Sequence, residues 1–302
     1  MKTVSLVIPV YAEAESLPAL FDELRAVEAQ LAARTCALEL IFVDDGSRDG
    51  SLNLLLQFRE THPATKIVKL ARNFGAVAAS KAGLGFVTGG CFAWLSADLQ
   101  DPPALIVEMV DAWLGGAKYV IAARTARRDP PLPRFFSALY YALLRRLVMP
   151  DYPQGGFDLA LIDQSLMAHL RDSGRQTNTE LLSFWLGVAP VIINYERRQR
   201  LHGKSGWTFA RKLGYARDSL LGFSPFLIRA ISLIGALVTV LSVCYGASAV
   251  LTGAPGFAAA FAVVIFLLGV IIFALGILGE YLWRIHNQLS QRPEVVIDHI
   301  YE

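Results

Sequence analysis

Cysteine is scarce in this chain of 302 residues, and its three copies, Cys36, Cys91 and Cys244, lie far apart. The number is odd and no pair has the short spacing of zinc ligands. The sequence therefore predicts neither a disulfide framework nor a zinc site, which fits a reducing compartment. Net charge is also small. The 28 basic and 26 acidic residues leave a formal charge of +2, too little to indicate nucleic-acid binding.

The usual phosphate-binding loops are missing as well. The first apolar run leads into polar residues, and Gly83 and Gly85 are followed by Thr88 where a dinucleotide fingerprint needs its third glycine. Residues 203–205 (Gly-Lys-Ser) resemble the end of a P-loop, but Arg198 stands where that loop needs glycine. No Ser-His-Asp or Cys-His arrangement emerges either. These absences exclude dinucleotide enzymes, P-loop NTPases and the common nucleophilic hydrolases.

Hydrophobic residues make up 54% of the chain, with a mean hydropathy of +0.43, and they are unevenly spread. Residues 1–225 carry charges throughout, whereas residues 230–282 are almost uncharged. Two uncharged runs, 230–251 and 257–279, are each long enough to cross a bilayer as a helix. A turn at 252–256 contains glycine and proline and separates them. The sequence predicts two C-terminal transmembrane helices.

Basic residues flank the outer ends of these two runs, and the turn between them has none. The flanking residues are Arg211, Lys212, Arg217, Arg229, Arg284 and Arg292. We expect a multi-pass protein of the inner membrane, and the positive-inside rule predicts that its large domain and both termini lie in the cytoplasm. We expect a cytosolic domain at 1–208, a juxtamembrane amphipathic segment at 209–229, a transmembrane hairpin at 230–282 and a cytosolic tail at 283–302.

The first 200 residues alternate between short apolar runs and helical stretches. Strands are predicted at 4–11, 39–43, 66–70, 91–95 and 119–123, with 191–195 as the last strand. Helices fill most of the intervals between them. This alternation indicates an α/β fold with a mostly parallel sheet and helices on both faces.

A polar segment at 96–103 follows one of these strands and precedes a predicted helix. We expect Asp101 to be the N-cap of that helix and Pro102 its first residue. Asp98 and Gln100 are two positions apart, so in extended chain both side chains point to one side. Their oxygens suit a hard cation, Mg²⁺ or Mn²⁺.

Polar residues follow each of the first strands, where the carboxyl ends of parallel strands meet. In open α/β sheets ligands bind at this edge. The residues concerned are Glu13, Asp44, Asp45, Asn73, Asp98, Gln100 and Arg124. A single polar turn is usually just solvated, but so many in register predict a shared crevice.

Four of these polar segments carry a resemblance to a known family. They are Pro-Val-Tyr-Ala-Glu at 9–13, Asp-Asp-Gly-Ser at 44–47 with Asp49, Arg-Asn-Phe-Gly at 72–75, and Ala-Asp-Leu-Gln-Asp-Pro-Pro at 97–103. In order and together, they resemble the motifs of family 2 glycosyltransferases. More narrowly, the chain is similar to the branch that transfers a sugar from a nucleotide to a polyprenyl phosphate, such as dolichyl-phosphate mannose synthases and undecaprenyl-phosphate sugar transferases. The similarity extends to Gly-Glu-Tyr-Leu at 279–282.

The resemblance implies a Rossmann-like GT-A catalytic domain, a UDP- or GDP-linked sugar donor, Mg²⁺ or Mn²⁺, and roles for particular residues. The donor-binding residues are Pro9, Tyr11, Glu13, Asp44, Asp45, Asn73, Lys204 and Ser205. The catalytic residues are Asp98, Arg124 and Arg200. Arg124, Arg134 and Ser137 face the acceptor phosphate, and Asp98 and Gln100 bind the metal. Arginine suits this task because its fork of donors matches phosphate oxygens.

Two departures leave alternatives open. The family often has Asp-x-Asp at the metal site, and Ser96 occupies the first position here. One alternative is therefore that this chain is a catalytically inactive relative that scaffolds or flips a lipid. A processive polysaccharide synthase is the other alternative, although the chain lacks the Gln-x-x-Arg-Trp signature and further helices of those enzymes. A helix predicted at 135–148 fits the membrane interface and the core equally well. The partners implied are the donor, the lipid phosphate, the membrane and, for a polymer channel, further copies of the chain.

Overall fold

The computed structural model describes residues 1–124, 131–153, 155–171, 173, 179–199, 256–289 and 293–302, with scattered positions between 214 and 248. Two compact units divide the chain. The first joins Met1–Ala216 to Pro293–Glu302, and the second is Arg217–Arg292. Residues 293–302, expected as a cytosolic tail, thus belong to the first unit. The membrane side of each predicted segment stays a prediction.

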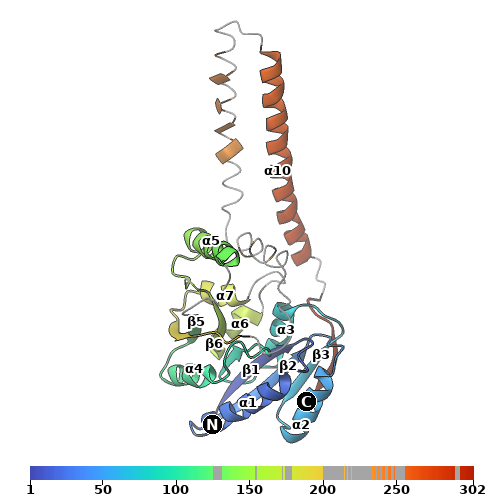
Figure 1. Cartoon of the computed structure of the whole chain (residues 1–302), viewed down its shortest axis with the longest axis vertical. Helices are drawn as coiled ribbons and strands as arrows, with labels where there is room; N and C mark the ends of the chain where they lie inside the picture. The colour runs from blue at the N-terminus through green and yellow to red at the C-terminus, as the bar shows by residue number, and fades with distance from the viewer. Residues whose placement is uncertain are drawn as a thin grey trace. The chain divides into compact units, whose positions relative to one another are not determined.

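The described residues of the first unit form an eight-stranded sheet in the order β7-β5-β6-β4-β1-β2-β3-β8 (Figure 1). The strands are β1 Lys2–Val10, β2 Cys36–Asp44, β3 Lys66–Leu70, β4 Cys91–Trp94, β5 Tyr119–Arg124, β6 Phe157–Asp163, β7 Val191–Tyr195 and β8 Ile297–Tyr301. Only β6 and β8 run antiparallel to their neighbours in this part of the chain. The expected mostly parallel sheet is confirmed, and the carboxyl ends of the other strands share one edge, called the carboxyl edge below.

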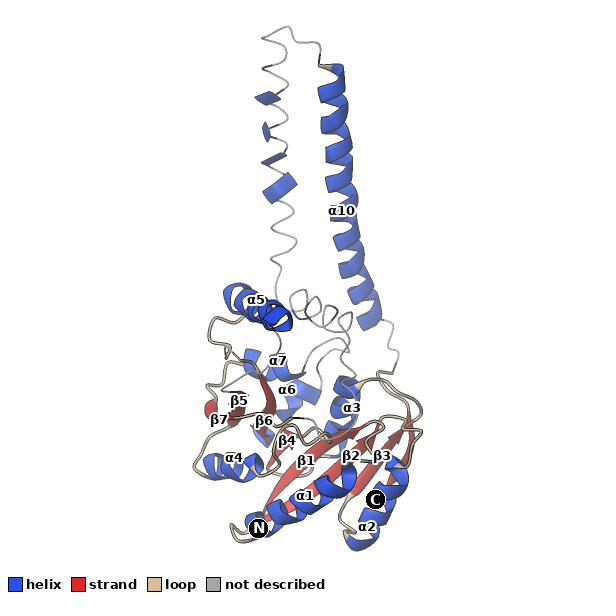
Figure 2. Cartoon of the chain, in the orientation of Figure 1, coloured by secondary structure: helices blue, strands red, loops and turns tan. Residues whose placement is uncertain are grey.

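Helices alternate with these strands along the chain, as expected (Figure 2). They are α1 Leu17–Ala32, α2 Ser51–Thr61, α3 Ala76–Gly83, α4 Leu105–Leu114, α5 Pro131–Leu147, α6 Met167–Arg171 and α7 Thr179–Trp185, with 3-10 turns at Leu84–Phe86 and Gln164–Leu166. The start of α4 differs from expectation. Its N-cap is Ala104 without a side-chain hydrogen bond, so neither Asp101 nor Pro102 opens it. Asp101 is a partner of Tyr195 instead.

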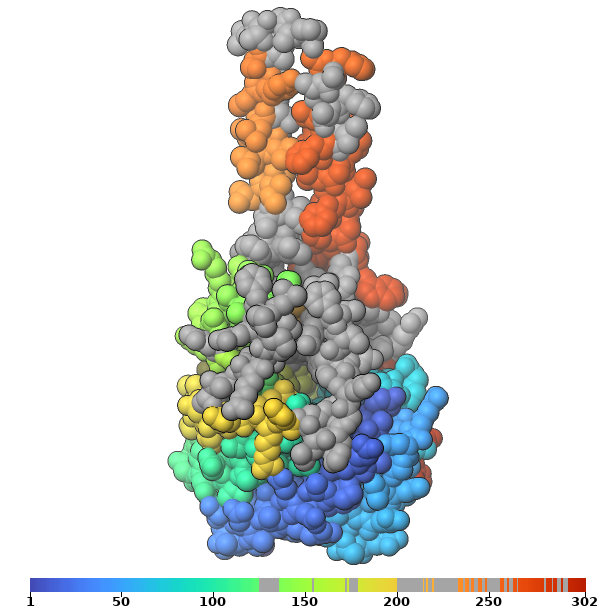
Figure 3. Space-filling view, viewed as in Figure 1, coloured from blue at the N-terminus to red at the C-terminus, as the bar shows by residue number. Residues whose placement is uncertain are grey.

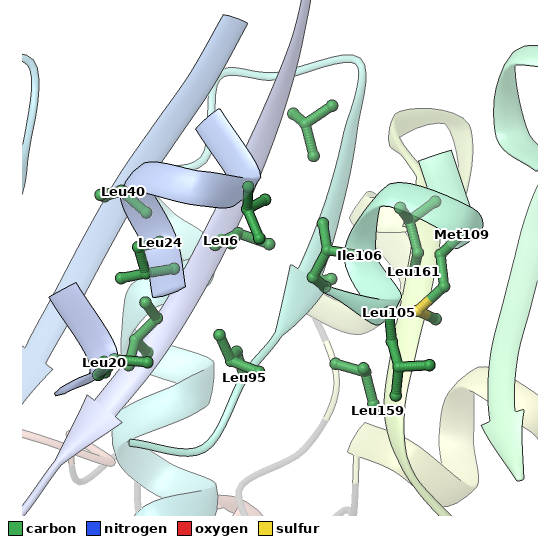
Figure 4. Close-up of a cluster of buried hydrophobic side chains, with 14 of the residues drawn as sticks. Leu6, Leu20, Leu24, Leu40, Leu95, Leu105, Ile106, Met109, Leu159 and Leu161 are labelled. Carbon is green, nitrogen blue, oxygen red and sulfur yellow. The ribbon is translucent and has the colours of Figure 1, made fainter. Parts of the chain in front are cut away.

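The two faces of the sheet follow the alternation of side chains along each strand. Leu6 of β1 packs against Leu20 and Leu24 of α1 in one continuous buried core (Figure 4). Val7, the next residue, points to the opposite face. There a methyl group added at Gly83 of α3 would lie 2.3 Å from a Val7 side-chain carbon. Helices therefore cover both faces, and glycine lets α3 approach β1 closely.

Strand β6 was not predicted, and it joins the two halves of the sheet. It lies between β4 and β5 and is antiparallel to both. Leu159 and Leu161 of β6 are buried in the core near Ile106 and Met109 of α4 (Figure 4). Because β6 runs opposite to its neighbours, its first residues, not its last, reach the carboxyl edge.

Strand β8 makes the prediction of 191–195 as the last strand wrong. It pairs antiparallel with β3 at the edge of the sheet. Just before it, the carbonyl of Val296 accepts a hydrogen bond from Ala71 N at 2.9 Å. Lys69 also pairs with Asp298, with 2.6 Å between Nζ and Oδ2. The chain thus returns to the first unit after the second.

Helix α5, which covers most of the stretch at 135–148, is buried on one side and exposes apolar side chains on the other, and its place at a membrane interface stays a prediction. Leu144 is buried, and the ring of Tyr141 stacks on Tyr152 with 6.0 Å between centroids. Phe136 and Leu139 are about half exposed. One side of the helix packs on the first unit and the other presents apolar side chains.

In the second unit the structure describes one long helix, α10 Phe257–Leu289. Among the described residues it alone has the length and composition to cross a membrane. Its window Phe266–Trp283 has a mean hydropathy of 2.1 and no buried residue, and its side chains are orange to red in Figure 3. Described residues of the run at 230–251, such as Leu233 and Leu237, are helical and exposed. Most of that run and of the predicted segment at 209–229 lies outside the described residues, so two transmembrane helices remain a prediction.

Candidate active site

The loops after β1 and β2 are bound to each other at the carboxyl edge. Ala12 N donates to Ser47 Oγ at 3.1 Å, and Glu13 N donates to Ser51 Oγ at 3.0 Å. Tyr11, between strand and loop, is half exposed. Two predicted donor-binding residues, Tyr11 and Glu13, are therefore held beside the loop that begins at Asp44.

Asp45 holds a third loop in place. Its two carboxylate oxygens accept hydrogen bonds from Phe74 N at 2.7 Å and Gly75 N at 2.9 Å, and its own N–H donates to Val10 O. Burial raises the pKa of Asp45, and the two amide donors oppose that rise. The carboxylate expected to face the donor thus positions the loop that carries Asn73.

Gly46 allows these loops to meet. Its φ of +70° belongs to the left-handed region, where a side chain is strained. A Cβ atom there would also lie 2.6 Å from the backbone carbon of Arg72. Glycine after the two aspartates is therefore required by both conformation and space.

Asp44 has an unusual environment for a carboxylate. It is fully buried, and Oδ1 accepts a hydrogen bond from Ser47 N at 3.1 Å. Oδ2 is buried as well and accepts no hydrogen bond from the described residues. Burial raises the pKa of Asp44, while the Ser47 bonds lower it less. An unpaired buried oxygen of this kind is costly for folding, which is typical of a functional position.

Asp98 lies just beyond the end of β4 and is oriented by its neighbours. Oδ1 accepts hydrogen bonds from Ser96 Oγ at 2.8 Å and Gln100 N at 3.1 Å. Leu99, between them, has a φ of +59°, which is rare for a side chain of its size. The serine that departs from the family pattern therefore orients Asp98, and a strained turn supports the arrangement.

The donor set around Asp98 fits a shared metal site, not a closed one. Among the described residues, no group of three or more His, Cys, Asp or Glu side chains lies close enough to hold an ion. Asp98 offers one carboxylate, and Gln100 is a half-buried amide. Mg²⁺ commonly binds one or two carboxylates and completes its shell with substrate phosphates and water.

A chain of charges crosses the ends of β5, β6 and β7. The guanidinium of Arg124 contacts the carboxylate of Asp158, and Arg197 Nη2 lies 3.5 Å from the same Asp158 oxygen. On its other side, Arg197 Nε lies 3.5 Å from Oδ1 of Asp101, which also accepts a hydrogen bond from the Tyr195 hydroxyl. Burial and the adjacent Asp101 raise the pKa of Tyr195. Two arginines and two aspartates thus balance each other's charge.

Comparison with known proteins identifies the family. Residues 5–170, more than half of the chain, match the family described as Glycosyl transferase family 2.

The chain belongs to glycosyl transferase family 2.

This glycosyltransferase resembles its relatives along nearly its whole length. It is 30% identical to an uncharacterized glycosyltransferase of Synechocystis sp. (strain ATCC 27184 / PCC 6803 / Kazusa), over 98% of this chain and 95% of that protein. It is 28% identical to a bactoprenol glucosyl transferase of Shigella phage SfX, over 97% of this chain and 98% of that protein. A prophage bactoprenol glucosyl transferase homolog of Escherichia coli (strain K12) is 27% identical, over 98% of this chain and 99% of that protein.

A solved structure of similar fold is glucosyl-3-phosphoglycerate synthase from Mycobacterium tuberculosis in complex with Mn²⁺, UDP-glucose and phosphoglyceric acid. The TM-score is 0.52 at 16% identity, and the match covers 73% of this chain and 78% of that one. The likeness extends to the fold alone, which is α/β and GT-A-like.

The structure brings several predicted site residues of the glycosyltransferase to the carboxyl edge and leaves others undescribed. Pro9, Tyr11, Glu13, Asp44, Asp45, Asn73, Asp98, Gln100 and Arg124 lie at the ends of strands or in the loops after them. Ser137 lies in α5 and is half-buried. Arg134 belongs to the same helix, but its side chain lies outside the described part of the structure. Arg200, Lys204 and Ser205 lie wholly outside it. Their roles stay predictions.

Four charged or polar residues of this edge were not predicted as site residues. They are Asp101, Asp158, Tyr195 and Arg197. The glycines before Asp158 indicate that the chain passes close to another segment there. A Cβ on Gly155 would lie 2.9 Å from the carbonyl oxygen of Arg124. The glycine lets the start of β6 approach the end of β5, which places Asp158 beside Arg124.

Proposed function

We propose that this glycosyltransferase transfers a sugar from a nucleotide-linked donor to a polyprenyl phosphate at the cytoplasmic face of the inner membrane. The observation that carries the proposal is the extent of the similarity to bactoprenol glucosyl transferases. It continues through the apolar C-terminal region to nearly the full chain, well past the family match at residues 5–170. A lipid acceptor explains the apolar region, because that region would hold the enzyme at the bilayer surface where donor and acceptor must meet.

The loops after β1–β3 support a nucleotide site. Asp44 and Glu13 are carboxylates, which accept hydrogen bonds from base N–H groups and ribose hydroxyls. The buried unpaired oxygen of Asp44 is the strongest support, since a donor hydroxyl would satisfy it. Pro9, Tyr11 and Asn73 complete the proposed site, with Lys204 and Ser205 closing over the diphosphate.

Asp98 and Gln100 are the residues that would hold a divalent ion together with the donor diphosphate. Bound there, Mg²⁺ or Mn²⁺ would neutralise charge that develops on the leaving nucleoside diphosphate. The orientation of Asp98 by Ser96 at 2.8 Å supports an active enzyme rather than an inactive scaffold. No described feature favours a processive synthase.

The reaction needs little acid–base chemistry from the chain. The acceptor phosphate is ionised at neutral pH, so its oxygen can attack the anomeric carbon of the sugar directly. The bond from that carbon to the donor diphosphate breaks, a phosphodiester forms, and the configuration at the carbon inverts. Arg124, with Arg134 and Ser137, would hold the phosphate in line for attack, while Arg200 would act near the reacting groups.

The full chain in detergent, incubated with undecaprenyl phosphate and a panel of labelled UDP- and GDP-sugars, tests the proposal. We expect label to enter the lipid fraction with one donor, with inverted configuration, and to stop on chelation until Mg²⁺ or Mn²⁺ is returned. Asp98→Asn should slow transfer by about 10³-fold, whereas Asp22→Asn, a control with a side chain 77% exposed, should not change it. Label appearing in polymer, or retained configuration, would refute the proposal.

A further inference from the structure

Arg197 and Arg124 lie next to each other because of the strand order. Arg124 ends β5, and in the parallel pairing of β5 with β7 it stands opposite Tyr195, two residues before Arg197. Asp158 is the second residue of β6, which lies on the other side of β5. Three strands therefore deliver two arginines and one aspartate to the same point of the carboxyl edge.

A single carboxylate oxygen lies between the two guanidinium groups. Oδ2 of Asp158 contacts Nη2 of Arg124 and lies 3.5 Å from Nη2 of Arg197. The side chains of Arg124, Arg197 and Asp158 are 12%, 30% and 34% exposed, so a ligand from solvent can reach the pair. An oxyanion shared by two arginines is the arrangement that phosphate groups adopt in proteins.

Each of the two arginines also has a buried N–H group that makes no hydrogen bond to Asp158. Nε of Arg124 and Nε of Arg197 are both buried and donate no hydrogen bond to the described residues, although Arg197 Nε lies 3.5 Å from Asp101 Oδ1 in an ion pair. Buried donors are normally satisfied, so these two point to a ligand with more acceptor oxygens than Asp158 supplies. Asp101, held by the Tyr195 hydroxyl, keeps Arg197 from swinging away.

We propose that Arg197 binds a phosphate group together with Arg124, and that Asp158 is a positioning residue that holds both arginines in the absence of that group. An incoming phosphate replaces the Asp158 oxygen between the two guanidinium groups and takes up their spare donors. Asp158 therefore orients the two guanidinium groups for the phosphate and also competes with the phosphate for them. The inference rests on the proposed function for its ligand class, a phosphate oxyanion. That oxyanion belongs either to the lipid acceptor or to the donor diphosphate.

Binding to the full chain in detergent tests this without sugar transfer, with farnesyl phosphate and UDP as separate probes in titration calorimetry. Asp158→Asn removes the competing charge, so we expect one of the two probes to bind about tenfold more tightly. Arg197→Gln should weaken the same probe by about tenfold. If the affinity for farnesyl phosphate changes, the phosphate bound by the two arginines belongs to the lipid acceptor. If the affinity for UDP changes, it belongs to the donor.

Two matched variants serve as controls. Asp163→Asn makes the same charge change at the opposite end of β6, and Arg198→Gln changes the next arginine, which pairs with Glu23 on the surface. Neither should alter either affinity by more than about twofold. Unchanged or weaker binding of both probes in Asp158→Asn, or unchanged binding in Arg197→Gln, would overturn the inference. If Asp158→Asn does not fold, the Arg197→Gln result decides.

Kinetics separates positioning from a merely structural role. We expect Asp158→Asn to lower the KM for the responding substrate and to lower kcat as well, because the arginines lose their orientation and product leaves more slowly. A structural defect would raise KM or lower the amount of folded enzyme instead. If the wild-type chain binds farnesyl phosphate but transfers no sugar to polyprenyl phosphate, the proposed function fails while the phosphate site stands.

Discussion

The aspartates of the carboxyl edge have different partners in its two halves. The first half consists of the loops after β1–β3. There Asp45 accepts hydrogen bonds from the backbone N–H groups of Phe74 and Gly75. In the second half, where β4, β5 and β7 end and β6 begins, Asp158 is paired with the side chains of Arg124 and Arg197. The chemistry of the carboxylate is the same, but one partner is a fixed backbone and the other a movable cation.

The difference in partners means that Asp45 supports the structure of a loop, whereas Asp158 occupies a site that another anion can take. A carboxylate bound to amides cannot leave without unfolding a loop, since buried amides need acceptors. A carboxylate bound to arginines can be replaced by another anion with little change in the backbone. We therefore expect substitutions in the first half to change stability more than those in the second half.

The largest effect is expected for Asp98→Asn in the second half. Losing the carboxylate that we propose faces the donor diphosphate should reduce kcat by about 10³-fold, the size typical of a lost electrostatic group. Asparagine can still accept from Ser96 or Gln100, so the melting temperature should change by no more than about 2 °C. Initial rates and thermal unfolding check both parts. A loss of folding as large as the loss of rate would contradict the division between the halves.

Asp45→Ala in the first half should have the opposite profile. It leaves the buried N–H groups of Phe74 and Gly75 without an acceptor, which should cost about 2–4 kcal/mol in the free energy of unfolding. Thermal unfolding of the full chain measures the change, with the exposed Asp22→Ala as control. An unchanged melting temperature would show that the loop at 72–75 does not depend on this carboxylate.

Asp44→Asn should stabilise the fold slightly and make it less sensitive to pH. The raised pKa of Asp44 means that the folded state binds its proton more tightly than the unfolded chain does. Stability from this group is therefore present at low pH and is lost as pH rises from the ordinary aspartate range through the raised value. At pH 7 the variant should gain about 1 kcal/mol, since a buried neutral amide costs less than an unpaired charge. Melting temperatures between pH 4.5 and 8 should converge at the acidic end, and a constant difference would argue against ionisation as the cause.

The first half of the sheet could be predicted from sequence because its elements are local. Buried apolar runs end abruptly in polar motifs, and β3 was predicted at its observed bounds, Lys66–Leu70. Strand β8 could not be found in this way, because Ile297–Tyr301 pairs with residues more than 200 positions earlier. Its hydrophobic residues, Ile297, Ile300 and Tyr301, lack the strict alternation that predicts a half-buried strand.

The site divides in the same manner. Asp44 ends β2, Asp45 follows it and Asp98 comes four residues after β4, so their place on the carboxyl edge follows from the nearby strand alone. The pairing of Arg124 with Asp158 depends instead on β6 entering antiparallel between β4 and β5. No local pattern contains that strand order, so the sequence alone does not place Asp158 beside Arg124.

The decisive measurement compares the two Michaelis constants in one variant from each half, Asp44→Asn and Arg124→Gln. Asp44→Asn should raise the donor KM by about tenfold and leave the acceptor KM within about twofold, and Arg124→Gln should do the reverse. Such a crossed pattern is what a nucleotide site after β1–β3 and a lipid-phosphate site around the ends of β5–β7 require. If both variants raise the same Michaelis constant, the two substrates do not divide the edge between them.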